Sequence, residues 1–260
     1  MLVFSQIALL VLTMVAPIIL LIIYAYVKSR GWRAVFYGIL FSILVLVAVR
    51  FLLPMLFLNQ SWFQALIANI PLYLTLYSLL YAGLCVLAIW LPFRYLFKDA
   101  GADRALVYGF SFGLAYEALF IGFNGVAALL SVNADHSGTD LGGIWFGIIE
   151  ALAVLILFSG FALQIKKGMD EKKPLWMAAA FGEIFLFFFL GMAWSTLFGW
   201  PRSLQEILLI AVCILMGYWI SRSFSFKSLF AVEENAEAYD YEQKGMSKQE
   251  KKHRKRQSHS

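Results

Sequence analysis

The sequence predicts an all-α protein, a polytopic transmembrane helix bundle of about seven spanning helices, with its N-terminus outside and its C-terminus in the cytoplasm. Composition is the first reason: 62% of the 260 residues are hydrophobic and 14% are charged, whereas about a quarter of a soluble domain is charged. The second is the length of the apolar runs, which suffices for a bilayer core of about 30 Å at about 1.5 Å per residue. The third is the uneven distribution of positive charge between the loops.

The expected spans follow one another with short loops between them. We place them near residues 3–27, 34–58, 70–93, 104–131, 141–165, 174–199 and 203–223. Pro71, Pro174 and Pro201 lie at or near the starts of the third, sixth and seventh spans, where a missing N–H group costs no hydrogen bond. The first run lacks a basic start and is followed by cations, so we expect a span there and not a cleaved signal peptide.

Positive charge lies in every second loop. Cations follow the first, third and fifth spans, at Lys28, Arg30, Arg33, Arg94, Lys98, Arg104, Lys166, Lys167, Lys172 and Lys173. The second and fourth loops contain no Lys or Arg. Because cytoplasmic loops carry the excess of these residues, the pattern predicts the orientation given above. We expect a multi-pass protein of the cell membrane, in a bacterial plasma membrane, in contact with the lipid bilayer.

The chain divides into two regions by composition. Residues 1–229 form the expected transmembrane domain, and residues 230–260 form an expected disordered cytoplasmic tail. The tail has an acidic stretch, then a basic stretch, and too few apolar residues to form a core. Basic residues beside a membrane are attracted to anionic lipid headgroups, which are therefore the expected partner of the tail. We predict no specific nucleic acid partner.

Four charged residues interrupt the apolar runs: Arg50, Glu117, Glu150 and Glu183. A charge at the centre of a bilayer costs about 3 kcal/mol on insertion scales, and more in simulations. Such residues need a partner, a proton or a water-filled cavity. We therefore take all four as candidate functional residues.

Arg50 and Glu150 are a candidate ion pair. Counted from the ends of their spans, both lie about 13 Å below the outer face. Pro54 also follows Arg50 by one turn and removes the hydrogen bond to the Arg50 carbonyl. This leaves either a tolerated kink near a helix end or a functional break.

Glu117 lies on a patterned face of the fourth span. Gly109, Gly113, Glu117 and Asn124 recur at helical spacing on this face. Small residues let a neighbouring helix approach closely, and they leave room beside a carboxyl group. The pattern predicts that Glu117 faces the bundle interior near the midplane. A purely structural acid, bonded to a neighbouring helix, is the alternative.

Several chemistries have no motif in this sequence. No His-Glu-x-x-His, Gly-x-Ser-x-Gly or Walker motif occurs, and the three histidines lie in the fourth loop and the tail. Carboxylates alone would hold a metal weakly. We therefore predict no cofactor and no metal.

Three stretches resemble the YhfC family of glutamic-type intramembrane peptidases, distant relatives of the CAAX-processing proteases. They are Tyr81-Ala-Gly-Leu with Arg94-Tyr-Leu-Phe-Lys beyond it, Gly109-Phe-Ser-Phe-Gly-Leu-Ala-Tyr-Glu-Ala, and Ile148-Ile-Glu-Ala. Arg94, Glu117 and Glu150 match motif positions of the family. The resemblance implies that Glu117 and Glu150 are the candidate catalytic residues. Arg50, Arg94, Asn124 and Glu183 are the candidate substrate- or ion-binding residues.

The chain departs from the family pattern at most other motif positions. Trp90 and Leu91 replace paired glutamates, Gly113 and Phe158 replace histidines, and Ala151 replaces an arginine. In the family, a glutamate would activate water and histidines would support the developing charge on the carbonyl. The resemblance therefore implies a weakly active or non-catalytic paralogue that binds membrane-embedded peptide segments.

Two other classes of function remain open. A secondary transporter or channel would use Glu150, Glu117 and Glu183 as a carboxylate ladder for protons or cations, with Arg50 as counter-charge. A complex-assembly or immunity factor would bind another membrane protein, and its buried charges would only fix helix register.

Overall fold

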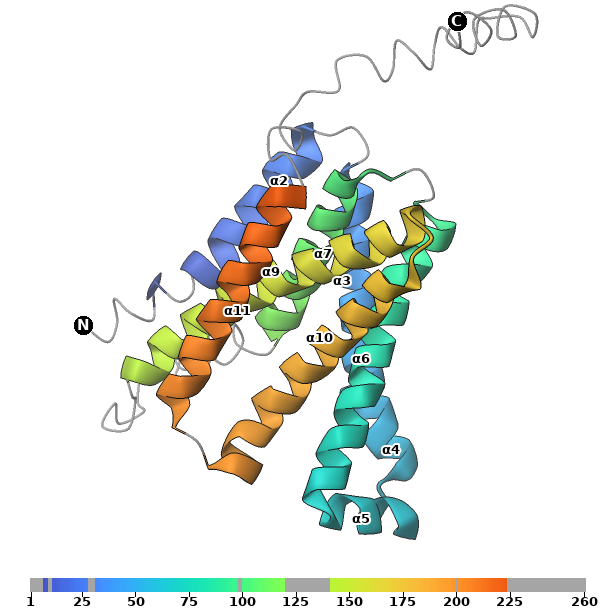
Figure 1. Cartoon of the computed structure of the whole chain (residues 1–260), viewed down its shortest axis with the longest axis vertical. Helices are drawn as coiled ribbons and strands as arrows, with labels where there is room; N and C mark the ends of the chain where they lie inside the picture. Colours follow the sequence, from blue (N-terminus) through green and yellow to red (C-terminus); the bar gives the residue numbers. More distant parts are fainter. Residues whose placement is uncertain are drawn as a thin grey trace, which may run out of the picture.

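The computed structural model describes residues 7–8, 11–27, 31–97, 100–119, 141–199 and 201–223, and the elements in this part of the chain are helical (Figure 1). In chain order they are η1 (Val11–Val15), α2 (Ala16–Val27), α3 (Gly31–Val47), η2 (Ala48–Leu52), α4 (Leu53–Phe57), α5 (Ser61–Ala68), α6 (Ile70–Tyr95), α7 (Ala102–Glu117), α9 (Leu141–Asp170), α10 (Pro174–Ala193), η5 (Trp194–Phe198) and α11 (Arg202–Ser223), where η denotes a π-helical segment. Asn124, the later part of the expected fourth span and the expected tail lie outside the described residues.

Five helices in the described ranges are long and apolar enough to cross a membrane. They are Gly31–Phe57, Ile70–Tyr95, Trp145–Asp170, Pro174–Ala193 and Ser203–Arg222. These match the second, third, fifth, sixth and seventh expected spans. The described part of the first span is a shorter apolar helix, Val11–Val27, and α7 has 16 residues. Seven crossings are therefore not confirmed.

Large apolar side chains cover the outside of the bundle. Ile22, Met55 and Leu215 are among many that are more than half exposed. A surface of this kind, together with the five apolar helices, indicates a membrane protein whose outer helices contact lipid.

Consecutive long helices alternate in direction. The end of α2 lies beside the start of α7, since the Tyr24 hydroxyl donates a hydrogen bond to Asp103 at 3.4 Å. The start of α3 lies beside the end of α6, where the ring centroids of Tyr37 and Phe97 are 5.6 Å apart. These contacts gather the ends of α2 and α6 and the starts of α3 and α7 at one end of the bundle.

The same end holds the turn between α9 and α10 and the end of α11. Lys167 lies over the ring of Trp176 at 4.3 Å and over that of Trp219 at 5.8 Å, so it joins all three helices. Lys173 hydrogen-bonds the exposed carboxylate of Glu171 at 3.0 Å and lowers its pKa, with Lys167 adding to the effect. We call this end the basic end. It carries the described cations Arg33, Arg94, Arg104, Lys166, Lys167, Lys172, Lys173 and Arg222.

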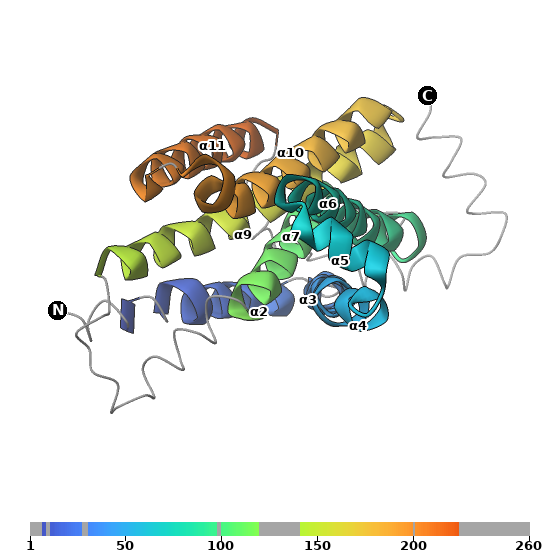
Figure 2. The ribbon, with the colours of Figure 1, turned by 90° about the horizontal axis from the view of Figure 1, so that it is seen from below.

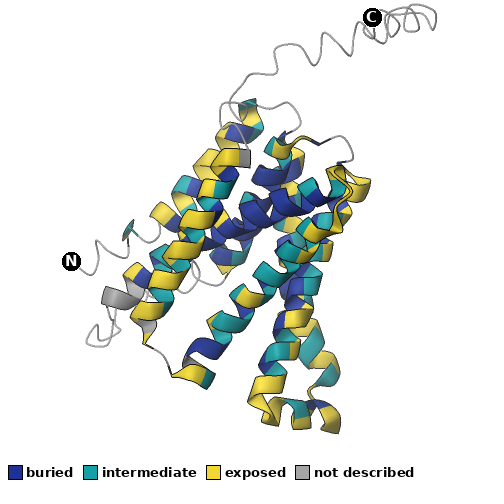
Figure 3. Ribbon diagram, viewed as in Figure 1, coloured by how far each residue is buried: buried dark blue, intermediate teal, exposed yellow. Residues whose placement is uncertain are grey.

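The centre of the bundle is the antiparallel pair α7 and α9. Figure 3 shows burial concentrated on these two helices, and Figure 2 shows α9 between α10 and α11 on one side and α2 and α7 on the other. The glycine face predicted from the sequence forms their contact. A Cβ atom on Gly109 would lie 2.2 Å from the Phe158 carbonyl oxygen, and one on Gly113 would lie 3.1 Å from that of Val154. The prediction of close helix packing at these glycines is confirmed.

The other face of α7 packs on α3 by the same means. A Cβ atom on Gly38 would lie 2.1 Å from the Ser111 hydroxyl and 2.6 Å from the Tyr108 carbonyl oxygen. The buried Tyr108 hydroxyl donates a hydrogen bond of 2.7 Å to the Ala88 carbonyl on α6. α7 is therefore enclosed by α3, α6 and α9.

Besides η5, the described residues contain π-helical turns at or beside three of the buried or candidate polar residues. η1 contains the buried Thr13, and η2 contains Arg50. The backbone turns π-helical again at Ala118, directly after Glu117. At η2 the Leu53 amide donates to the Ala48 carbonyl, five residues back. The helix therefore continues through Pro54 with one widened turn, as expected where a proline removes an α-helical hydrogen bond.

Replacing Gly109 with alanine should destabilise the protein, because the new methyl group would overlap the backbone of α9. Overpacking of this kind costs about 1–3 kcal/mol. Gly182→Ala is the matched control, since nothing lies within 4 Å of the position that its Cβ atom would take. Thermal unfolding of both purified variants in detergent measures the difference. Equal midpoints for the two variants would contradict the close contact at Gly109.

Replacing Lys167 with methionine should lower the stability of the contact between α9, α10 and α11, because two cation–π contacts are lost. Each such contact contributes about 0.5–1 kcal/mol at an exposed site. The control is Lys173→Met, which removes a neighbouring cation with an exposed side chain. Thermal unfolding of the two purified variants in detergent, followed by circular dichroism, measures the difference. A larger loss of stability in the control would show that the turn, and not the tryptophan pair, depends on charge.

Candidate functional site

Two of the three quoted stretches, the one that ends at Glu117 on α7 and the one around Glu150 on α9, lie opposite each other. A Cβ atom on Gly113 would lie 3.3 Å from the Cβ of Phe158, so these two positions face each other. Gly109 faces Phe158 and Ser159, and Gly113 faces Val154 and Leu155. The antiparallel register then places Glu117, one turn beyond Gly113, opposite the turn of α9 that contains Glu150. The two carboxyl groups interact electrostatically, so the structure brings the two candidate catalytic residues together.

Glu117 is fully buried, with 0% of its surface exposed. Neither carboxylate oxygen has a hydrogen-bond partner in the described part of the chain. The hydroxyl group of Thr13 on η1 lies close enough to act on the carboxyl group as a donor, but it does not form a hydrogen bond of normal geometry. A buried polar group in this state costs about 1–3 kcal/mol or more, and natural proteins rarely leave one without a reason.

Glu150 links this carboxyl group to a second set of polar side chains. It is half-buried and interacts electrostatically with Tyr116 as well as with Glu117. Arg50 also interacts electrostatically with Tyr116, and with Tyr77 and Tyr81 of α6. Arg50 is exposed on the surface of the bundle. The ion pair between Arg50 and Glu150 stays a prediction, but both residues lie within electrostatic range of one tyrosine.

Aromatic rings form the wall beside these residues. The Tyr81 ring lies 4.0 Å from that of Phe188 and 6.2 Å from that of Tyr116, and Tyr116 lies 5.9 Å from Phe158. Tyr81 is buried, and its hydroxyl has no hydrogen-bond partner among the described residues. The site therefore contains an unsatisfied acceptor, Glu117, and an unsatisfied donor, Tyr81.

Tyr81 and Tyr116 lie inside the quoted stretches, but they are not among the predicted site residues. The sequence does contain a pattern that indicates a tyrosine face on the third span. Tyr73, Tyr77 and Tyr81 recur every fourth residue and so share one helix face. Their rings follow one another at 5.6 and 6.1 Å along α6. Aromatic residues are common in membrane helices, and spacing alone does not separate such a face from ordinary packing.

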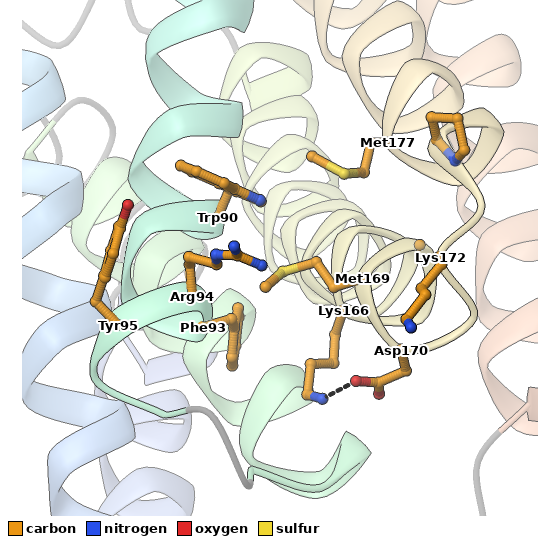
Figure 4. Close-up of a pocket in the computed structure, with 11 residues that line it drawn as sticks. Trp90, Phe93, Arg94, Tyr95, Lys166, Met169, Asp170, Lys172 and Met177 are labelled. Carbon is orange, nitrogen blue, oxygen red and sulfur yellow. Dashed lines mark hydrogen bonds and ion pairs between the residues drawn. The ribbon is translucent and has the colours of Figure 1, made fainter.

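Arg94 does not join Glu117 and Glu150. It lies at the basic end, where it lines a pocket with residues of α9 and α10 (Figure 4). On α6 it is more than three turns beyond Tyr81, or about 20 Å along the axis. The candidate site predicted from the sequence is thus divided between two places. Asn124 lies outside the described residues.

Glu183 also has a separate position, between α9 and α10. The Gln164 amide donates hydrogen bonds to both of its carboxylate oxygens, at 3.2 and 3.0 Å. Gln164 lies about four turns beyond Glu150 on α9, or about 21 Å along the axis. Phe158 and Phe161, both buried, lie on α9 between the two levels. The distance along α9 therefore does not favour transfer of a proton or cation between Glu183 and the Glu117–Glu150 pair.

Glu117 and Glu150 together can bind a hydrogen-bond donor or carry a proton. Two carboxyl groups in one apolar site can accept hydrogen bonds from a ligand, and with water between them they can act as general acid and base. No group of three His, Cys, Asp or Glu side chains in the described ranges could hold a metal ion.

No family model matches the chain, and neither a curated protein nor a solved structure gives a significant match to it.

Proposed function

We propose that this membrane protein is a YhfC-like, non-catalytic paralogue that binds a polypeptide segment inside the membrane at Glu117 and Glu150. One observation carries the proposal: both oxygens of the fully buried Glu117 lack a partner among the described residues, and Glu150 is close enough to act on them. A ligand that supplies hydrogen-bond donors would satisfy these oxygens.

A polypeptide has the required chemistry. Its backbone N–H groups become donors wherever a membrane helix unwinds, and a bilayer offers no water to satisfy them. The unsatisfied Tyr81 hydroxyl can in turn donate to a backbone carbonyl. The rings of Tyr81, Tyr116, Phe158 and Phe188 supply an apolar wall for the side chains of the segment.

Binding is favoured over cleavage by the packing at positions 113 and 158. In the family these two positions carry the histidines that would support the carbonyl. Here Gly113 and Phe158 face each other in close contact, and Phe158 stacks on Phe112 with ring centroids 5.0 Å apart. An imidazole at position 113 would need the space that the Phe158 side chain and the α9 backbone occupy. Oxyanion support from these positions is therefore lost.

We also propose seven crossings of a bacterial plasma membrane, with the N-terminus outside. The alternation of helix direction supports this, because α6 and α9 both end at the basic end, as expected if the chain crosses the membrane between them. α7 runs antiparallel to α9 and begins that crossing. The positive charge gathered at the basic end supports its cytoplasmic position.

The proposal predicts that Glu117→Gln and Glu150→Gln each weaken capture of a membrane polypeptide several-fold, because a lost hydrogen bond contributes about 0.5–1.5 kcal/mol. A photoreactive phenylalanine analogue in place of Tyr116, whose half-buried ring is part of the aromatic wall, would capture the segment in intact membranes. Mass spectrometry would identify one defined sequence and its length.

Glu183→Gln is the matched control, because it makes the same chemical change at a distant carboxyl group that is bonded to Gln164. Capture should be unchanged in this variant, and the captured segment should be intact. Fragments that disappear with Glu117→Gln would show an active peptidase. Ion flux in liposomes that is lost with both Glu117→Gln and Glu183→Gln would favour a transporter.

A further inference from the structure

The pocket at the basic end lies where three apolar helices reach the edge of their spans. Its lining includes Tyr95, Asp170 and Pro174, which are the end residues of the candidate spans Ile70–Tyr95, Trp145–Asp170 and Pro174–Ala193. A point at which three spans end is at the boundary between hydrocarbon and water, whichever side of the membrane it faces. The pocket has a volume of about 680 Å³, which is in the range of small-molecule sites.

The polar part of the lining is positively charged. Arg94, Lys166 and Lys172 line the pocket together with one acid, Asp170. Lys166 is 6% exposed and forms an ion pair with Asp170, so these two charges compensate each other. Arg94 and Lys172 are left as the excess positive charge. Figure 4 shows the Arg94 guanidinium in the middle of the pocket, pointing toward Met169 from α6.

The remaining lining is apolar. Trp90 and Phe93 from α6, Met169 from α9 and Met177 from α10 contribute to it. Tryptophan and tyrosine are enriched at the headgroup level of membranes, and Trp90 and Tyr95 here contact each other with ring centroids 6.2 Å apart. A ligand that suits the pocket thus has an anionic head and an apolar body.

We propose that this pocket binds the phosphate headgroup of an anionic membrane lipid, with Arg94 and Lys172 on the phosphate and the Trp90, Met169 and Met177 side chains against the glycerol and first methylene groups. A guanidinium presents a planar pair of donors that matches phosphate oxygens. Basic pockets between membrane helices on the cytoplasmic side are known to bind lipid headgroups. The pocket is separate from the site around Glu117 and Glu150, since Arg94 lies about 20 Å along α6 from Tyr81, a residue of that site.

Native mass spectrometry of the full chain in detergent tests the proposal, with dioleoylphosphatidylglycerol and dioleoylphosphatidylcholine as probes. The wild-type protein should retain the anionic lipid selectively. Arg94→Gln combined with Lys172→Gln should reduce this retention by about tenfold, because hydrogen bonds to charged groups are lost. Arg94→Lys should show a partial loss, since it keeps the charge but not the paired donors.

Arg222→Gln is the charge-matched control. Arg222 lies at the same end of the bundle, is exposed, and stacks on Tyr218 outside the pocket. An equal loss of retention in this variant would overturn the proposal, as would equal retention of the two lipids by the wild type. Inorganic phosphate is the third probe. If it displaces the lipid at millimolar concentration, the site belongs to a soluble phosphate compound and the assignment to lipid is wrong.

A second measurement needs no variant. A photoreactive phosphatidylglycerol analogue in liposomes with the wild-type protein should label peptides from residues 90–97 and 166–177 above the level of a phosphatidylcholine analogue. Equal labelling of all lipid-facing helices by both analogues would contradict a specific pocket, even if the variants fail to fold.

Discussion

The close contact between α7 and α9 fixes the rest of the structure. Gly109 and Gly113 allow the backbones to approach until a single methyl group would overlap the opposite chain. Lipid tails are as apolar as leucine, so membrane helices associate through such packing and not through the hydrophobic effect. The register of this contact brings Glu117 to the level of Glu150, and it leaves little space for a side chain at position 113.

The consequence is a site whose described side chains are carboxyl groups and aromatic rings. Glu117 and the Tyr81 hydroxyl are buried with no partner among the described residues, and Glu150 connects Glu117 to Tyr116. A structural role would normally satisfy such groups inside the protein, as Gln164 does for Glu183. The contrast between the two glutamates is the physical reason to place binding at Glu117 and a structural bond at Glu183.

The sequence predicts most of the helix positions and part of the candidate site. Apolar runs and prolines predicted most helix positions, because span length is set by bilayer thickness and proline suits a helix start. The glycine spacing around Glu117 predicted the tight face correctly. The expected spans already placed Arg94 at the end of the third span and Glu117 near the midplane, and only the motif resemblance grouped Arg94 with the glutamates. The sequence could not reveal the Gln164–Glu183 bond or the tyrosine wall, which depend on the pairing of α9 with α10 and of α6 with α7.

The register of α7 against α9 is the central claim, and thiol crosslinking in native membranes tests it most directly. In a background with Cys85→Ala and Cys213→Ala, the pair Glu117→Cys with Glu150→Cys would be treated with a short bifunctional thiol reagent. We predict efficient crosslinking of this pair and none for Glu117→Cys with Gln164→Cys, about four turns away on α9. Crosslinking of the second pair, or of neither while Gly113→Cys with Phe158→Cys also fails, would contradict this register.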